Sequence, residues 1–177
     1  MRQVREGGAG PLVERPDEMS ERAIKLADRL HSVVDDSLAT VAGIPDDKWT
    51  AFCPPEQCTV AALASHLGSS ATGVMSFLVQ PMAEGKPLPA ITPELINAGN
   101  AQNARENASR PKDETLDEIR MNGGAVVTAV RGLSDAQLDR SAVLFFSPDP
   151  VTTEFVIENA LVNHLRGHLD SLKAAIA

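Results

Sequence analysis

The sequence predicts an all-α protein, a bundle of four or five helices. Apolar residues recur at spacings of three and four along its long segments, which is the period of a helix face and not of a strand. Hydrophobic residues make up 43% of the chain but aromatic residues only 3%, so the core must be built from small aliphatic side chains. Such a composition suits closely packed helices better than a β-sandwich. The sequence shows neither an internal repeat nor a convincing sheet pattern, either of which would contradict this fold class.

The 177 residues fit one domain with a normal core. Residues 1–16 are expected to form a flexible N-terminal tail, because their glycine-rich tract has no apolar periodicity. Residues 17–177 are expected to form a single helical-bundle domain. Asp17 or Ser20 is the predicted N-cap of its first helix, which runs to about Ala42.

Start and stop signals place the remaining elements. Further helices are expected over residues 59–79, 92–109, 113–133 and 153–176. Their predicted N-caps are Thr59, Asp113 and either Thr152 or Thr153, and their predicted stops include Pro81 and Pro111. Residues 134–150 are expected to be a connector that contains one short apolar run.

Charge and composition exclude several classes of protein. The formal net charge of −8 and the dispersed basic residues work against nucleic-acid binding, which needs a basic patch. No apolar stretch approaches 18 residues and no signal region opens the chain, so the sequence predicts no membrane span and a cytoplasmic location. Cys53 and Cys58 do not make a disulfide framework and are interpreted as two inert thiols.

His164 and His168 lie four residues apart on the predicted last helix, within an apolar stripe. On a helix of 3.6 residues per turn, their rings project from one face about 40° apart, and the apolar neighbours indicate that this face points towards the core. A buried polar group without a partner costs on the order of 1–3 kcal/mol. A divalent metal would remove that cost, and so would hydrogen bonds to carbonyls or carboxylates. The pair alone leaves both interpretations open.

His66 offers a third imidazole from the predicted second helix, on a face of small residues. Three imidazoles from two helices can converge in a bundle core and leave one coordination position of a metal open. Such a site would suit Zn²⁺, Ni²⁺ or Fe²⁺, and imidazole ligands alone do not choose among them.

Two further groups of residues are candidates for a pocket. Glu158 is placed on the histidine side of the last helix and is the candidate catalytic residue, as a general base or as a carboxylate that orients an imidazole. The alternative is an acidic residue favoured by the start of a helix, which is the preferred interpretation of Glu154. Asn100 and Asn103 are candidate substrate-binding residues in an asparagine stripe that would otherwise be a solvated helix face.

The order of these features resembles the DinB-like superfamily, especially its mycothiol-dependent maleylpyruvate isomerase-like branch. The resemblance spans about residues 18–175. It lies in Trp49 after a long first helix, in the segment 58–67 that ends in His66-Leu, in an asparagine-bearing segment, and in the terminal stretch 162–172 with its two histidines.

The resemblance implies a DinB-like four-helix bundle with an extra helical segment between the second and third main helices. It implies that His66, His164 and His168 hold a divalent metal, expected to be zinc, with nickel or iron as alternatives. It also implies an asparagine segment near the pocket, a homodimer, and chemistry on a low-molecular-weight thiol such as mycothiol or bacillithiol.

The leading function is therefore a metal-dependent thiol S-transferase or thiol-dependent isomerase. Its rival is a non-catalytic bundle that binds a metal or small ligand, or that serves as a stress-response module. A structural bundle without any metal is the third interpretation.

Overall fold

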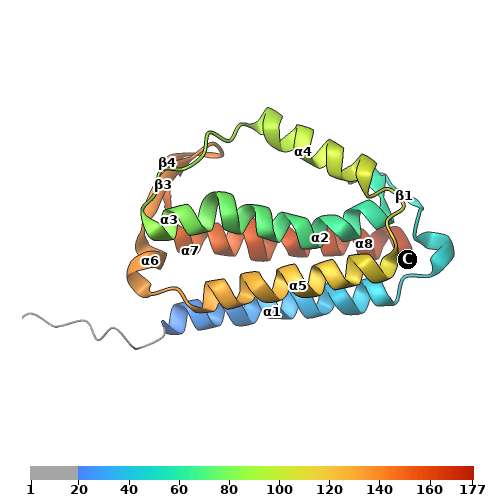
Figure 1. Ribbon diagram of the computed structural model, residues 1–177, viewed down its shortest axis with the longest axis horizontal. Coiled ribbons are helices and arrows are strands. Elements are labelled where there is room, and N and C mark those ends of the chain that lie inside the picture. The colour runs from blue at the N-terminus through green and yellow to red at the C-terminus, as the bar shows by residue number, and fades with distance from the viewer. Residues whose placement is uncertain (1–19) are drawn as a thin grey trace, which may run out of the picture.

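Four long helical segments pack side by side in the computed structural model, which describes residues 20–177 (Figure 1). The predicted tail, residues 1–16, and the alternative cap Asp17 lie outside the described residues. The helices are α1 (Glu21–Ala42), α2 (Val60–Val74), α3 (Gln80–Glu84), α4 (Pro93–Glu106), α5 (Lys112–Arg131), α6 (Asp135–Asp139), α7 (Thr153–Val156) and α8 (His164–Ile176). A short 3₁₀ helix, η1 (Asp46–Lys48), and two π-helical segments, η2 (Met75–Val79) and η3 (Ile157–Asn163), complete the helical elements of this part of the chain.

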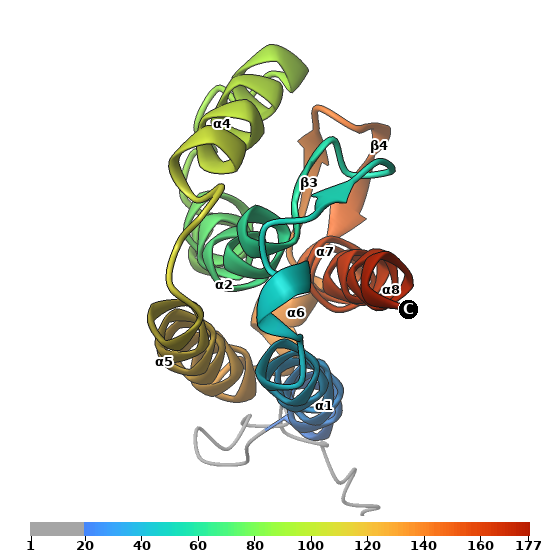
Figure 2. The ribbon, with the colours of Figure 1, turned by 90° about the vertical axis from the view of Figure 1, so that its right-hand side faces the viewer.

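The arrangement confirms the predicted fold class. Seen along the bundle, α1 lies between α5 and the last helix, and α2 lies across from α1 (Figure 2). The extra helical segment is α4, which follows the second main helix and crosses the outside of the bundle (Figure 1). None of the α4 residues is fully buried, so this helix is an addition to the bundle and not part of its core.

Several predicted helix caps are present. The side chain of Ser20 accepts a hydrogen bond from the backbone N–H of Ala23, and Thr59 and Thr152 cap α2 and α7 in the same way. The predicted cap Asp113 is wrong, since α5 begins at Lys112 after Pro111 and Asp113 lies inside its first turn. An acidic residue there still favours the helix, because the N-terminal end of a helix carries partial positive charge.

The second main helix does not end at Pro81 as the sequence suggests. It runs from α2 through η2 into α3 and ends at Gly85, which has a left-handed backbone conformation with φ of 68°. Proline lacks an N–H and normally interrupts a helix. The helix accommodates Pro81 directly after a wide π turn, in which the N–H of Gln80 donates to the carbonyl of Met75, five residues back.

Within the described residues, one helix is long and apolar enough to cross a membrane by length and composition alone. This helix is Val60–Glu84, and 56% of its most apolar window is buried inside the bundle. The expectation that no apolar stretch approaches 18 residues is therefore wrong. This degree of burial is typical of a helix in the core of a bundle.

Two short antiparallel hairpins were missed in the sequence. The first pairs β1 (Phe52–Cys53) with β2 (Cys58–Thr59), and the second pairs β3 (Ser141–Leu144) with β4 (Ser147–Thr152). The supposed connector thus holds α6 and a hairpin. Both hairpins project on the side of the bundle where α4 lies, above α2 and the last helix (Figure 2).

The core is aliphatic, as the composition predicts, and contains no phenylalanine. The largest fully buried side chains are leucines, isoleucines and valines from all four main helices. All five phenylalanines of the chain are exposed, by 43–58% of their surface: Phe52, Phe77, Phe145, Phe146 and Phe155.

Candidate metal centre

The three predicted histidines converge. His66 projects from α2, and His164 and His168 from the first two turns of α8. One ring nitrogen from each lies within 4.8 Å of the others, and the two Nε2 atoms of His164 and His168 are 3.2 Å apart. Two nitrogen ligands at the usual zinc distance from a tetrahedral ion stand about 3.3 Å apart, so this spacing fits a bound metal. The ring centroid of His66 lies 4.9 Å from that of His168 and 5.9 Å from that of His164.

The histidine pair lies at the edge of the bundle and not in its core, which corrects the expected inward orientation. His164 is exposed and His168 is half-buried, whereas Leu161 and Leu165 of the same helix are buried. Solvent therefore reaches the site from the His164 side. A metal site with three protein ligands needs such an open side for a fourth ligand.

The rings of His66 and His164 are held neutral. Burial is the largest cause and the neighbouring His168 the next, and together they lower the pKa of each to about 4. Neutral imidazole is the form that ligates a metal, because protonation removes the lone pair. The site therefore offers metal-binding nitrogens at neutral pH.

Glu56 is a site residue that the sequence analysis did not identify. Its Oε2 lies 3.1 Å from Nδ1 of His168, and both side chains are mostly buried. Burial opposes ionisation of the Glu56 carboxyl, but a hydrogen bond from Ser171 and the nearby histidines outweigh it, so its pKa lies below the ordinary value. No periodicity could have indicated Glu56, because the residue lies in a loop that folds back onto α8. Its position between two cysteines and directly after two prolines was the only available signal.

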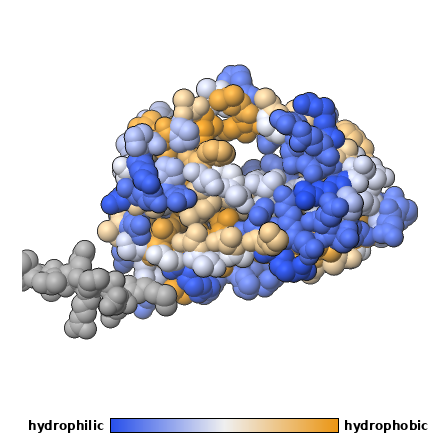
Figure 3. Space-filling view, viewed as in Figure 1, coloured by the Kyte–Doolittle hydropathy of each residue, from blue (hydrophilic) through white to orange (hydrophobic). Residues whose placement is uncertain are grey.

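A small cavity of about 80 Å³ adjoins the histidines. It is lined by Glu56, Cys58, Ala62, Leu63, His66, Asn100, Asn103, Ala104 and His168. The structure thus brings both candidate asparagines of α4 to the site. Figure 3 shows a gap between α4 and the main body of the bundle, with hydrophobic residues on its side towards the start of α4 and hydrophilic residues on its side towards the end of α4.

The two asparagines differ in their hydrogen bonds. Asn103 donates from Nδ2 to the carbonyl of Ala62 at 3.3 Å, and its Oδ1 accepts from Asn107 at 3.0 Å. The first contact links α4 to α2, and together the two contacts use part of the hydrogen-bonding capacity of the Asn103 amide within the fold. Asn100, one turn earlier, lines the cavity and is exposed.

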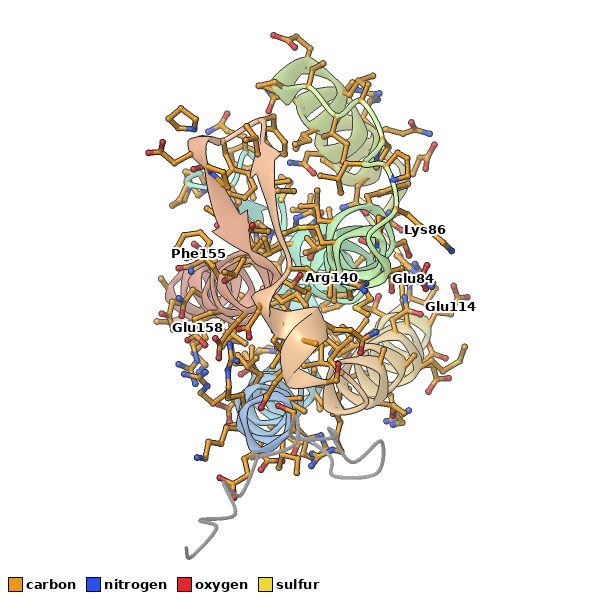
Figure 4. All side chains as sticks on the ribbon, turned by 90° about the vertical axis from the view of Figure 1, so that its left-hand side faces the viewer. Glu84, Lys86, Glu114, Arg140, Phe155 and Glu158 are labelled. Carbon is orange, nitrogen blue, oxygen red and sulfur yellow. The ribbon has the colours of Figure 1, made fainter. Side chains whose placement is uncertain are left out.

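Glu158 does not lie with the histidines, which corrects its predicted placement. Its carboxylate pairs with Arg29 of α1 at 2.5 Å, and Glu154 pairs with Arg22 at the same distance. Both glutamates line a separate open hollow of about 460 Å³, on the side of the last helix that faces α1 (Figure 4). Six residues separate Glu158 from His164, which places them about 120° apart around an ideal helix, and Glu158 lies within the π segment η3 that ends just before His164.

The fold and the site together define a class of protein: a four-helix bundle in which the second and last helices present three imidazoles for a metal. The family follows from the sequence match. The chain belongs to the mycothiol maleylpyruvate isomerase N-terminal domain family, whose model matches residues 30–175. This confirms the resemblance to the DinB-like superfamily.

Two solved structures share the fold. YfiT from Bacillus subtilis, described as a probable metal-dependent hydrolase with an unusual four-helix bundle topology, is 18% identical with a TM-score of 0.69. That match covers 92% of this chain and 90% of YfiT. An uncharacterized protein from Clostridium difficile 630 is 12% identical with a TM-score of 0.68, over 89% of this chain and 96% of the other. No curated protein matches the sequence.

Proposed function

We propose that this protein is a divalent-metal-dependent enzyme that uses or modifies a low-molecular-weight thiol, as an S-transferase or thiol-dependent isomerase. The convergence of His66, His164 and His168 carries the proposal. Zinc is the metal that we expect, because three neutral imidazoles with an open position are typical of catalytic zinc sites. Membership of a family named for a mycothiol-dependent isomerase supports the choice of a thiol.

The residues around the histidines suit such a reaction. A divalent metal held there would lower the pKa of a thiol or water that it coordinates. Asn100 offers an amide at the cavity wall that can hydrogen-bond a polar substrate, and Asn103 holds the helix that carries it. Ala62, Leu63 and Ala104 on the cavity wall would contact an apolar part of the second substrate.

A metal-dependent hydrolase is the second candidate. The description of YfiT as a probable metal-dependent hydrolase favours it, because the same open position can take water in place of a thiol. The expected homodimer, the cytoplasmic location and the lack of nucleic-acid binding stay predictions.

Metal analysis tests the first half of the proposal. Protein purified without a histidine tag is expected to contain about one divalent metal per chain, and His168→Ala to lose most of it. His31→Ala is the matched control, because His31 is exposed on α1 and contacts Asp35 at 3.3 Å, away from the site. Metal content that is equally low in the wild type and in His168→Ala would contradict the metal centre.

An assay of thiol consumption tests the second half. The zinc-loaded protein is mixed with a small thiol and a model electrophile, and loss of free thiol is followed over time. We expect turnover that His168→Ala abolishes and His31→Ala retains. Hydrolysis of a model ester or amide without thiol consumption would favour the hydrolase. Metal binding without either activity would indicate a non-catalytic binding protein.

A further inference from the structure

Glu56 contacts the histidine cluster from behind. Its carboxylate approaches Nδ1 of His168, while Nε2 of the same ring faces Nε2 of His164. Within residues 20–177, the group of side chains close enough to share one metal comprises the three histidines and does not include Glu56. Glu56 is therefore placed to act on a ligand and not to be one.

The contact determines where His168 carries its proton. Nδ1 is buried and has no well-aligned hydrogen-bond partner among the described residues, so the Glu56 carboxylate is its polar neighbour. An imidazole lone pair would repel that carboxylate, whereas an N–H is attracted to it. A neutral ring with its proton on Nδ1 leaves the lone pair of Nε2 free. We propose that Glu56 is a positioning residue that keeps His168 in this tautomer and orients its Nε2 towards the metal, an inference that rests on the proposed function.

The geometry of His164 agrees with this assignment. With the lone pair of His168 on Nε2, His164 can donate its own Nε2–H across the 3.2 Å gap in the metal-free protein. If the His164 proton then moves to Nδ1, the lone pairs of both Nε2 atoms are free to bind a metal, and both rings remain neutral. A carboxylate behind a metal-binding histidine is a common device for fixing the ring, and its removal weakens metal binding.

The hairpin β1–β2 is built to hold Glu56 in this place. Cys53 and Cys58 face each other across the two strands, and Glu56 lies in the turn between them. The next residue, Gln57, has φ of 53°, a left-handed conformation that a residue with a Cβ adopts rarely. The side-chain amide of Gln57 donates to the carbonyl of Pro54 at 2.6 Å and braces the turn. Such uncommon backbone conformations persist at sites where the surrounding structure requires them.

Zinc affinity tests the proposal directly. Zn²⁺ binding to the tag-free protein is measured by competition with a chromophoric chelator, for the wild type, Glu56→Gln and Glu56→Ala. We expect Glu56→Ala to bind about 10- to 100-fold more weakly. Glu56→Gln is expected to lose less, because its amide oxygen can still accept from Nδ1. The matched control is Glu114→Gln on α5, an exposed glutamate that pairs with Arg110 and does not line the histidine cavity, which should bind as the wild type does.

The tautomer of His168 gives a second readout that a purely structural role would not move. Nitrogen-15 spectra of the metal-free protein at pH 8, assigned with His168→Ala, should show the proton of His168 on Nδ1 in the wild type. In Glu56→Ala it should no longer be confined to Nδ1. Thermal unfolding in the presence of EDTA checks that each variant is folded. If Glu56→Ala does not fold, the affinity and the tautomer are measured on the conservative variant Glu56→Gln.

The possible outcomes separate this inference from the proposed function. A wild-type protein that does not bind zinc overturns both. A wild type that binds zinc, with Glu56 variants of equal affinity and unchanged His168 tautomer, overturns the role of Glu56 and leaves the metal centre intact. Weaker binding together with a displaced His168 proton supports both.

Discussion

Cys58 lines the histidine cavity, yet its thiol is poorly suited to react. Burial, together with the neighbouring Cys53 and Glu56, raises the pKa of Cys58 to about 11. At pH 8 only about one thiol in a thousand is then ionised, and the thiolate is the reactive form. We predict that iodoacetamide modifies Cys58 about one to two orders of magnitude more slowly than free cysteine at pH 8.

The sign of the pH dependence follows from the raised pKa. Between pH 7 and 9.5 the rate of Cys58 alkylation should rise about tenfold per pH unit without levelling off. Mass spectrometry of Cys58→Ser separates the reaction from that of Cys53, which is fully buried. A rate that reaches a plateau below pH 9 would show a thiolate stabilised by its surroundings, and would make Cys58 a candidate nucleophile.

Glu158 and Arg29 form a partly exposed ion pair, with 28% and 48% of their side chains accessible. We predict that Glu158→Gln lowers the free energy of unfolding by about 1 kcal/mol or less, and less still at high salt, because solvent screens such pairs. Metal content should not change, since the carboxylate faces α1. Urea unfolding at two salt concentrations and elemental analysis check both statements. Loss of metal in this variant would show that Glu158 contributes to metal binding.

At this scale, sequence and structure agree where residue type and spacing suffice. The convergence of His66, His164 and His168 could be expected from a four-residue spacing, a small-residue helix face and a family resemblance. Asn100 followed from the resemblance and a polar stripe. Glu158 was misplaced because its spacing of six residues from His164 puts it about 120° around the helix, on another face. Glu56 depends on a loop returning to another helix, which no local pattern encodes.

At the scale of elements, α1 and α5 approach closely where Gly123 faces Val34. A Cβ at Gly123 would lie 2.7 Å from one Val34 methyl carbon and 2.8 Å from the other. We predict that Gly123→Ala costs about 1–3 kcal/mol of stability through overpacking. Gly124→Ala meets nothing within 4 Å, and should stabilise the protein by up to about 1 kcal/mol, because alanine favours helix.

Urea unfolding of the two variants measures this contrast. Val34→Ala introduced into Gly123→Ala should recover part of the lost stability, since it removes the clashing methyl groups. Equal effects of the two glycine substitutions would mean that helix propensity, and not the contact between α1 and α5, sets their cost.

The long helices were predictable because their caps and periodicity are local. Ser20, Thr59 and Thr152 act as caps in the structure as the sequence indicates. The hairpins were not predictable in the same way, since strands of two to six residues show no reliable alternation and depend on pairing across a turn. The helix end predicted at Pro81 was wrong for a related reason. A π turn accommodates this proline, and no local sequence pattern predicts that turn.

At the scale of the whole molecule, the candidate metal site joins helices that are distant in sequence. Its histidines come from α2 and α8, about a hundred residues apart, so a metal bound there would stabilise the folded chain and not the unfolded one. At 100 times its dissociation constant such a ligand adds about 2.7 kcal/mol. For a chain of this length that amounts to a rise in melting temperature of about 5–10 °C.

Differential scanning fluorimetry with Zn²⁺ and with EDTA tests this expectation. The rise should be reversed by EDTA and absent in His164→Ala. A melting temperature that does not respond to zinc in the wild type would argue against a site that links α2 to α8.

The π segment of the last helix has a consequence for how this chain can change length. Its upstream end holds Glu158 against α1, and its downstream end presents His164 beside α2. A π turn holds one residue more than an α turn, so removing one residue from 157–163 would let the backbone return to α-helical register and leave the direction of the downstream side chains nearly unchanged. Removing one residue between His164 and His168 has no such reserve, and would turn one histidine away from the other by about 100°. A change of length in this helix is therefore expected to be tolerated within 157–163 and not between the two histidines.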